Sequence, residues 1–210
     1  MGRVVIIDGE NLAYGVRELL AKKDEKYAPR AILLEYDFRG LIEELLEDQL
    51  PSKIIWFGAK LRYYDITPEL KSKTKDMISF QAKFANSLMN RQKIIFSKAG
   101  YLRARETDIC EGCKEVGWKL IEKGVDVAVA TEVIKQASEK NEIILISSDS
   151  DLLPAVKYVI KNGAKVMFVG RETRPIASLS NIATSTRLIT KPIAIKHKNV
   201  NKLKKNNINK

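Results

Sequence analysis

Residues 3–11 read RVVIIDGEN, a run of mostly β-branched apolar side chains that stops at an acid. A run that is apolar at successive positions is typical of a parallel strand buried on both faces. Asp8 and Gly9 end this strand, and apolar side chains then recur at helical spacing from Leu12 to Lys22. The stretch therefore predicts a buried strand, a turn that carries an aspartate, and a helix, which together begin a parallel α/β sheet.

The rest of the chain repeats this alternation. Short apolar runs predict further strands at residues 53–58, 92–105, 143–146 and 165–169, with a short edge strand around 188–189. Amphipathic segments predict helices at residues 37–50, 69–89, 113–122, 126–138 and 153–162. This order favours an α/β fold, a three-layer sandwich with a mainly parallel five-stranded sheet and helices on both faces. The composition changes near residue 190, so we expect one domain over residues 1–190 and a basic, disordered tail over 191–210.

The composition excludes several classes of protein. The 210 residues are 45% hydrophobic, enough for one sizeable core, and no apolar run is long enough to span a bilayer. The first residues lack the features of a signal peptide, so we expect a cytoplasmic protein. With Cys110, Cys113 and one histidine, His197, a single chain can form neither a four-ligand zinc site from Cys and His alone nor a Ser-His-Asp triad. We interpret the cysteines as ordinary thiols, and a redox pair or a site shared across a homodimer stays open.

Acidic side chains stand where predicted strands end or helices begin. Asp8, with Asn11 after it, ends the first strand, Asp149 and Asp151 follow the strand at 143–146, and Asp126 opens a helix. Each alone serves equally well as a helix cap. In open α/β sheets, however, ligands bind beyond the carboxyl ends of strands, and carboxylates gathered there repel one another unless a cation is bound. Oxygen ligands suit Mg²⁺ or Mn²⁺, and such an ion activates water for attack on a phosphodiester.

Three segments carry a resemblance to a known family. They are residues 4–11, 123–130 and 146–151, and in this order they resemble the signature blocks of the NYN domain family, in its LabA-like branch, over about residues 1–190. The resemblance implies a PIN-like Rossmannoid fold and metal-dependent cleavage of RNA. It implies that Asn11 holds Asp8 or contacts the scissile phosphate, and that the metal ligands are Asp8, Asp126, Asp149 and Asp151. Where the family pattern has a further Asp, this chain has Glu132, whose longer side chain gives it an outer role at most.

Positive charge predicts a polyanionic partner. The net charge is +11, and nine positive charges with no acid lie between Thr173 and Lys210. A second basic region between Gly58 and Arg105 contains tyrosines, a combination that suits single-stranded nucleic acid, although each tyrosine singly is better explained by packing. Lys123 serves equally as a phosphate contact or a surface lysine. The RNA contacts we expect flank strand ends: Lys60, Arg62, Arg103 and Arg105.

Two other functions stay open. One is a non-catalytic RNA-binding module on the same fold. The other is a phosphatase or nucleotide-binding protein on a similar sheet, although no G-x-x-x-x-G-K-[ST] or G-x-G-x-x-G loop follows a strand. The prediction that the sequence favours is a ribonuclease that uses Mg²⁺ or Mn²⁺ and acts on RNA, with no membrane partner.

Overall fold

The computed structural model describes residues 2–47, 50–109 and 116–198. The interpretation of Cys110 and Cys113 therefore concerns residues outside this range, as does the part of the predicted tail after Lys198. Among the helices that the structure describes, none is long and apolar enough to cross a membrane.

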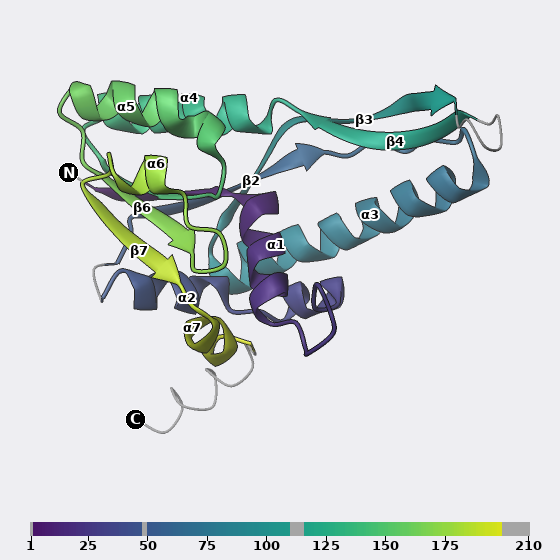
Figure 1. Cartoon of the computed structure of the whole chain (residues 1–210), viewed down its shortest axis with the longest axis horizontal. Coiled ribbons are helices and arrows are strands. Elements are labelled where there is room, and N and C mark those ends of the chain that lie inside the picture. The colour runs from purple at the N-terminus through teal and green to yellow at the C-terminus, as the bar shows by residue number, and fades with distance from the viewer. Residues whose placement is uncertain (1, 48–49, 110–115, 199–210) are drawn as a thin grey trace.

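A seven-stranded sheet forms the centre of the molecule (Figure 1). Its strands lie in the order β4-β3-β2-β1-β5-β6-β7, and all neighbours are parallel except the antiparallel pair β3 and β4. The strands are β1 (Arg3–Asp8), β2 (Lys53–Lys60), β3 (Ile95–Ile109), β4 (Val116–Lys123), β5 (Glu142–Ile146), β6 (Val166–Arg171) and β7 (Ser185–Ile189).

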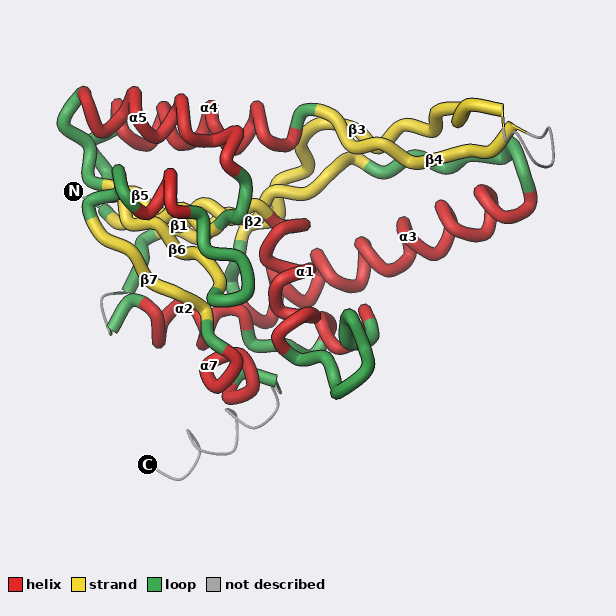
Figure 2. Tube along the Cα trace, viewed as in Figure 1, coloured by secondary structure: helices red, strands yellow, loops and turns green. Residues whose placement is uncertain are grey.

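Helices cover both faces of this sheet, so the three layers that the sequence predicts are confirmed (Figure 2). One face packs against α1 (Gly9–Leu19), α2 (Phe38–Leu45), the end of α3 (Pro68–Asn86) and α7 (Lys191–Lys196). The other face packs against α4 (Val125–Ser138), α5 (Leu153–Lys161) and α6 (Ala177–Ser180). Short turns of other helix types lie at Arg30–Leu34, Ser87–Arg91 and Ser150–Leu152.

The central strand β1 shows why its apolar run contains no polar break. Val5 and Ile7 belong to the core beneath α1 and α2, whereas Val4 and Ile6 belong to the core beneath α4 and α5. All four side chains are at most 2% exposed. Successive side chains of a strand point to opposite faces, so a strand covered on both sides must be apolar at every position.

Two details of the sheet differ from the sequence prediction. The sheet has seven strands instead of five, and residues 113–122, predicted as a helix, contain most of β4. This segment pairs with β3, so that Leu120 lies opposite Ala104 and Trp118 opposite Glu106. A short apolar run fits a helix or a strand equally well, and the pairing partner decides between them.

The described fold also continues past the boundary predicted at residue 190. Helix α7 follows β7, and Ala194 within it is fully buried. The Tyr36 hydroxyl donates to the Ala194 carbonyl at 3.0 Å, and the Asp37 N–H donates to the His197 carbonyl at the same distance. Residues 191–198 are therefore part of the folded body, because α7 closes the core beside α1 and α2.

An arm projects from the body on the side of β4. It consists of the outer parts of β3 and β4, which form a two-stranded ribbon, and of helix α3, which runs beside this ribbon (Figures 1 and 2). Strand β3 bends where it leaves the body, at Gly100, whose φ is +59°.

Candidate metal centre and nucleic-acid interface

Three aspartates from distant parts of the chain meet at one edge of the sheet. Asp8 is the last residue of β1, Asp149 follows β5, and β1 and β5 are parallel neighbours, so their carboxyl ends share this edge. Asp126 lies in the first turn of α4. One carboxylate oxygen from each of the three lies within 4.8 Å of the others. The convergence that the sequence predicts for these three residues is therefore present.

Two of these aspartates are also helix caps. Asp8 precedes α1, and its carboxylate accepts the N–H of Asn11 at 3.4 Å. Asp149 precedes the turn Ser150–Leu152, and its carboxylate accepts the N–H of Asp151 at 2.9 Å. The capping role that the sequence left open is thus real. It coexists with the cluster, because a carboxylate has two oxygens and several lone pairs.

Neighbouring polar side chains fix the orientation of Asp8. Its Oδ2 accepts hydrogen bonds from the Asn11 amide and, at 3.0 Å, from the Ser147 hydroxyl. The Ser147 oxygen in turn accepts the N–H of Asp149 at 3.1 Å. Ser147 therefore links two members of the cluster, a role that the sequence does not predict, because it depends on the register between β1 and β5.

Burial and mutual repulsion disfavour the charged forms of the clustered aspartates. Burial raises the pKa of Asp8, hydrogen bonds from Asn11 and Ser147 oppose this effect, and the charge of Asp149 adds to it. Partial burial raises the pKa of Asp126, and the charges of Asp8, Asp149 and Asp151 raise it further. Among the described residues, none of the three clustered aspartates forms a salt bridge.

Two other acids named by the sequence lie outside this group of three. Asp151 is exposed, and its N–H donates to the Asp149 carboxylate. Its charge reaches the site, since it contributes to the raised pKa of Asp126. Glu132 lies further along α4 and accepts a hydrogen bond from Gln136 at 2.8 Å. Glu132 therefore forms a hydrogen bond within its own helix.

A cleft of about 440 Å³ opens directly from Asp8 and runs between α1, α3 and strands β2 to β4. Two further acids, Glu10 and Glu122, line it. Glu10 is exposed over the residue as a whole, yet desolvation of its carboxyl group raises the pKa of that group. The charge of Arg30 opposes this shift, and the charge of Asp8 adds to it. Glu10 was not predicted as a site residue, although it lies inside the first signature block.

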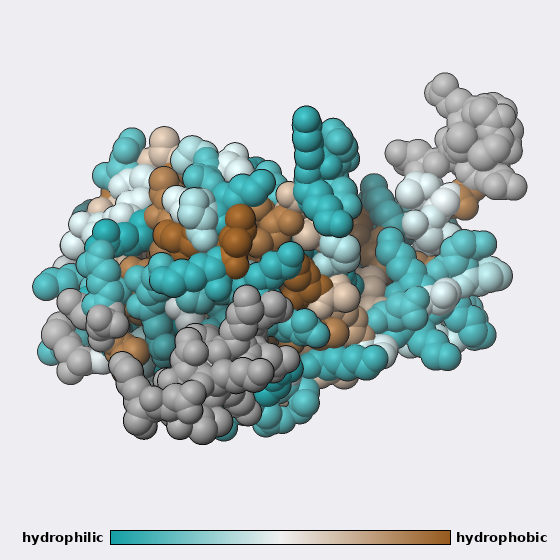
Figure 3. Space-filling view, turned by 90° about the horizontal axis from the view of Figure 1, so that it is seen from below, coloured by the Kyte–Doolittle hydropathy of each residue, from teal (hydrophilic) through white to brown (hydrophobic). Residues whose placement is uncertain are grey.

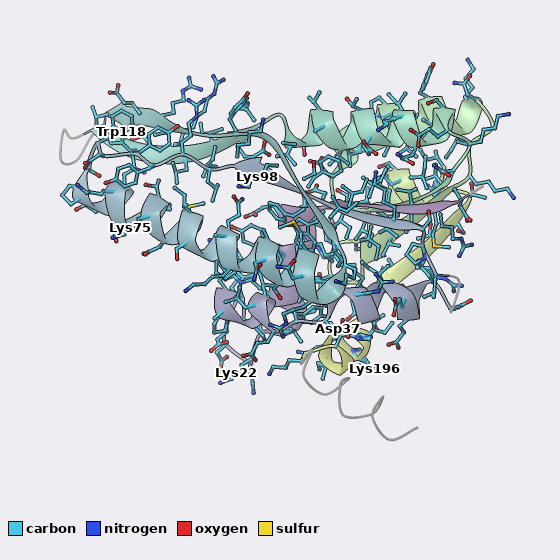
Figure 4. The ribbon with its side chains drawn as sticks, turned by 180° about the vertical axis from the view of Figure 1, so that it is seen from behind. Lys22, Asp37, Lys75, Lys98, Trp118 and Lys196 are labelled. Carbon is cyan, nitrogen blue, oxygen red and sulfur yellow. The ribbon has the colours of Figure 1, made fainter. Side chains whose placement is uncertain are left out.

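The arm carries most of the predicted RNA-binding residues on one face. In the β3–β4 register, Tyr101 lies opposite Lys123 and Arg105 lies opposite Lys119. Because side chains alternate along each strand, one face of the ribbon, which we call the basic face, contains Tyr101, Arg103, Arg105, Lys119, Ile121 and Lys123. No acid occupies these six positions. Trp118, labelled in Figure 4, belongs to the opposite face, with Leu102 and Leu120.

Tyr101 lies at the centre of a group of cations. Its ring centroid is 5.4 Å from the Lys60 ammonium, 5.4 Å from the Arg62 guanidinium and 5.7 Å from the Arg103 guanidinium. Tyr101 is 38% exposed, so it is not simply a core residue. Exposed aromatic rings among cations are common in sites that bind single-stranded nucleic acid.

Comparisons with known proteins bear on family and fold. A family profile described as the NYN domain matches residues 3–191. No curated protein matches the chain. Among solved structures, the chain is similar to a protein of unknown function from Vibrio parahaemolyticus, with a TM-score of 0.51 and 14% identity over 90% of this chain and 93% of that chain. That similarity concerns the fold alone. Because the profile covers nearly the whole chain, the protein belongs to the NYN domain family.

Proposed function

We propose that this protein is a metal-dependent ribonuclease that hydrolyses RNA phosphodiester bonds at the cluster of Asp8, Asp126 and Asp149. The observation that carries the proposal is the approach of three carboxylate oxygens to within 4.8 Å of one another. Three like charges at this spacing are unfavourable in a partly buried site without a counter-charge. Membership of the NYN family supports a nuclease as the use of such a site.

The residues fit a divalent cation of the Mg²⁺ or Mn²⁺ type. The clustered donors are carboxylate oxygens, which these ions prefer, and the raised pKa values of Asp8 and Asp126 reflect a site that favours added positive charge. When bound, the ion would lower the pKa of a water molecule and neutralise charge on the phosphate.

The neighbouring protein groups hold the carboxylates of the cluster in position. Asn11 and Ser147 hold Oδ2 of Asp8, so the carboxylate keeps one orientation as the phosphate approaches. Asp149 is held through the bond that its carboxylate accepts from the Asp151 N–H. Exposed Asp151 would orient water at the edge of the cluster. We assign metal binding to Asp8, Asp126 and Asp149, an accessory role to Asp151, and a positioning role to Asn11.

RNA contact is assigned to the exposed cations of the arm and to Lys60 and Arg62 at the end of β2. Lys60, Arg62 and Arg103 surround Tyr101, and Arg105 and Lys123 lie on the same basic face. Lys123 lies three residues before Asp126, so this end of the basic face is close to the start of α4. A strand of RNA bound along this face would therefore lead into the site.

The test is incubation of the purified protein with end-labelled single- and double-stranded RNA in Mn²⁺, Mg²⁺ or EDTA. Cleavage of the single strand with either metal, its absence in EDTA, and its loss in Asp149→Asn would support the proposal. Glu132→Gln is the matched control, because it removes an acid of α4 that lies outside the cluster. Equal cleavage by Asp149→Asn and Glu132→Gln would reject the assignment of the site.

One alternative has its own support. The basic face needs no metal, so the protein would also serve as a non-catalytic RNA-binding module. In that case RNA binding would be equal in EDTA and Mg²⁺, would fall steeply with salt, and would occur without cleavage. Hydrolysis of a small phosphate ester but not of RNA would instead indicate a phosphatase.

A further inference from the structure

The cleft beside Asp8 is lined mainly by apolar and aromatic side chains. Its walls come from elements far apart in the sequence and include Trp56, Met77, Phe80, Phe84, Phe96 and Leu102. Its volume of about 440 Å³ lies in the range of small-molecule pockets, roughly 300–1,000 Å³. In the view of Figure 3, apolar surface is exposed between hydrophilic regions of the molecule. The cleft is therefore a formed pocket, in which Met77, Phe80 and Phe96 are partly exposed.

The sequence of β2 helps to keep this space open. Trp56 faces the core beneath α1 and α2, and Gly58, two residues later, lies on the same face at the floor of the cleft. A Cβ atom at Gly58 would lie 2.9 Å from the Phe96 ring. Any larger side chain at position 58 would therefore displace Phe96 or occupy the pocket.

The rim of the cleft combines cations with aromatic rings. The Arg30 guanidinium carbon is 4.1 Å from the centroid of the Phe80 ring, and that ring stacks on Phe84 with an angle of 19° between their planes. Arg17 lies 5.7 Å from the Tyr14 ring at the adjoining surface. Flat rings and guanidinium groups are the surfaces on which unpaired bases stack.

A few polar groups interrupt the apolar lining. Glu10, Glu122 and Asp8 all line the cleft, and so does Gln81 of α3. The Gln81 amide donates to the Ala59 carbonyl at 2.9 Å, which fixes its orientation. A flat ligand with hydrogen-bonding edges matches this lining, since its faces would contact rings and its edge would meet a carboxylate or an amide.

We infer that this cleft is a nucleobase pocket that takes the base of one unpaired nucleotide next to the scissile phosphate. The position of that phosphate rests on the proposed function, because Asp8 belongs both to the cleft and to the aspartate cluster. The cations Arg17, Arg30 and Lys73 at the rim complement the flanking phosphates, although Glu69 and Asp76 stand near them. The pocket would select single-stranded RNA, since the faces of a paired base are covered by its neighbours in the duplex.

The experiment compares two tryptophan substitutions on adjacent residues of α3. Met77 lines the cleft, whereas Ile78 is 37% exposed and does not line it, so Met77→Trp fills the pocket and Ile78→Trp is its control. Binding of a labelled single-stranded RNA, and of the same RNA with abasic positions, is measured by fluorescence anisotropy in EDTA. In EDTA no metal-dependent cleavage interferes. Thermal melting of each variant shows whether it is folded, and Phe80→Leu replaces Met77→Trp if the latter is not.

We expect Met77→Trp to weaken RNA binding about tenfold, as for the loss of one stacked base, and Ile78→Trp to stay within about twofold of the unmodified protein. Abasic RNA should bind the unmodified protein more weakly, with little further loss in Met77→Trp. Equal RNA affinities for the two tryptophan variants would overturn the nucleobase pocket. A change of oligomeric state in Met77→Trp alone would also overturn it, because it would indicate that a second copy of the chain occupies the cleft.

The outcomes distinguish a failure of the nucleobase pocket from a failure of the proposed nuclease activity. Metal-dependent cleavage in the unmodified protein together with no effect of Met77→Trp on binding would leave the proposed function intact and remove the pocket. Pocket-dependent binding without cleavage in Mn²⁺ or Mg²⁺ would keep the pocket and reject the nuclease.

Discussion

Asp8 has roles in both folding and the proposed chemistry, and these roles oppose each other. As an N-cap it stabilises α1, and as a buried carboxylate beside Asp149 it carries a charge that the folded state disfavours. An asparagine at this position keeps the capping oxygen Oδ1 and loses the charge. Its amide nitrogen replaces Oδ2 as a donor, so the Asn11 amide must turn over and the Ser147 hydroxyl must rotate to accept from it. The substitution therefore separates the two roles.

We predict that Asp8→Asn abolishes RNA cleavage and stabilises the metal-free protein. The raised pKa of Asp8 means that the folded state disfavours the charged form, so removing this charge should raise the free energy of unfolding in EDTA, by an amount on the order of 1 kcal/mol. Cleavage in Mn²⁺ should fall at least about 100-fold, as for other transition-state contacts. Chemical denaturation in EDTA and a cleavage assay measure the two effects. A destabilised Asp8→Asn would contradict the electrostatic argument.

At the scale of single residues, the sequence predicts the clustered aspartates but not the side chains that hold them in place. Asp8, Asp126 and Asp149 could be identified because each stands at a strand end or helix start, where side chains gather in a parallel sheet. Ser147 could not, because a serine is common in such loops and its partner is set by the pairing of β1 with β5. Glu10 was missed because its surroundings come from α1, β4 and the turn that contains Arg30.

At the scale of single elements, the close approach of two glycines fixes how the arm joins the body. Gly100 in β3 has φ of +59°, and Gly124, just before α4, has φ of +91°. A Cβ atom at Gly100 would overlap the Lys123 carbonyl oxygen and would lie 2.7 Å from the Val125 nitrogen. The bend of β3 therefore positions the start of α4, and with it Asp126.

We predict that Gly100→Ala costs more stability than Gly163→Ala and also lowers cleavage. Gly163 has φ of +85° but open space around it, so alanine there meets only backbone strain of about 1–2 kcal/mol. At Gly100 the same strain is joined by a clash with backbone atoms, for a total loss of about 3 kcal/mol or more. Urea denaturation of both variants, with a cleavage assay, makes the comparison. Similar losses in the two variants would show that the contact with α4 is unimportant.

Helix α7 is attached to the body through an ionic contact that predicts a pH effect. Burial alone would raise the pKa of Glu44, but hydrogen bonds and charges from Lys196 and His197 outweigh it and lower this pKa below its usual value of 4.5. Glu44 accepts from Lys196 at 3.0 Å and lies 2.6 Å from Nε2 of His197. Because the folded-state pKa is the lower one, this contact stabilises the protein above about pH 4.5, and the contribution is lost as the pH falls through the folded-state pKa.

We therefore predict that Glu44→Gln lowers stability at pH 6 and lowers it less at pH 3. The loss should be about 1 kcal/mol or less, because the contact is partly exposed and screened. Glu43→Gln is the control, since Glu43 pairs with Arg39 on its own helix and does not reach α7. Urea denaturation at the two pH values gives the difference. An equal effect of Glu44→Gln at both would exclude the ionic contact as its cause.

At the scale of single elements, prediction from the sequence is wrong mainly where strand pairing decides whether a segment is a helix or a strand. Residues 113–122 contain a short apolar run whose spacing also fits a helix, and only the ladder with β3 makes most of them a strand. The basic composition after residue 190 predicts a tail there, so the sequence places the end of the fold too early. Ala194 is buried and its carbonyl accepts from Tyr36, so a basic segment of this kind can still pack onto the body.

For the whole molecule, the wrong prediction for β4 had the largest consequence. The three layers and the edge where the aspartates meet follow from the alternation of strands and helices, and so could be predicted. The arm could not, because it exists only when β4 pairs with β3 and both stand beside α3 (Figure 1). Arg103 and Arg105 were recognised as cations near a strand end, but their common face with Lys119 and Lys123 depends on that pairing.

The basic face makes a prediction about salt dependence. Removing one phosphate interaction from a single-stranded complex should reduce the slope of log K against log salt by about 0.7. We therefore expect the double variant Arg103→Gln/Arg105→Gln to reduce this slope by up to about 1.4, if each arginine meets one phosphate. RNA affinity at low salt should fall with it, while cleavage at saturating RNA should be retained, because neither arginine belongs to the aspartate cluster.

The matched control is Lys157→Gln/Lys161→Gln, which removes the same charge from α5, at the end of the molecule away from the arm (Figure 1). If binding depended only on net charge, the two double variants would lose affinity equally, since both reduce the charge of +11 by two. A loss confined to the arm variant would instead indicate local phosphate contacts. Equal losses would remove the basic face as a specific RNA-binding surface and leave a general attraction between a basic protein and a polyanion.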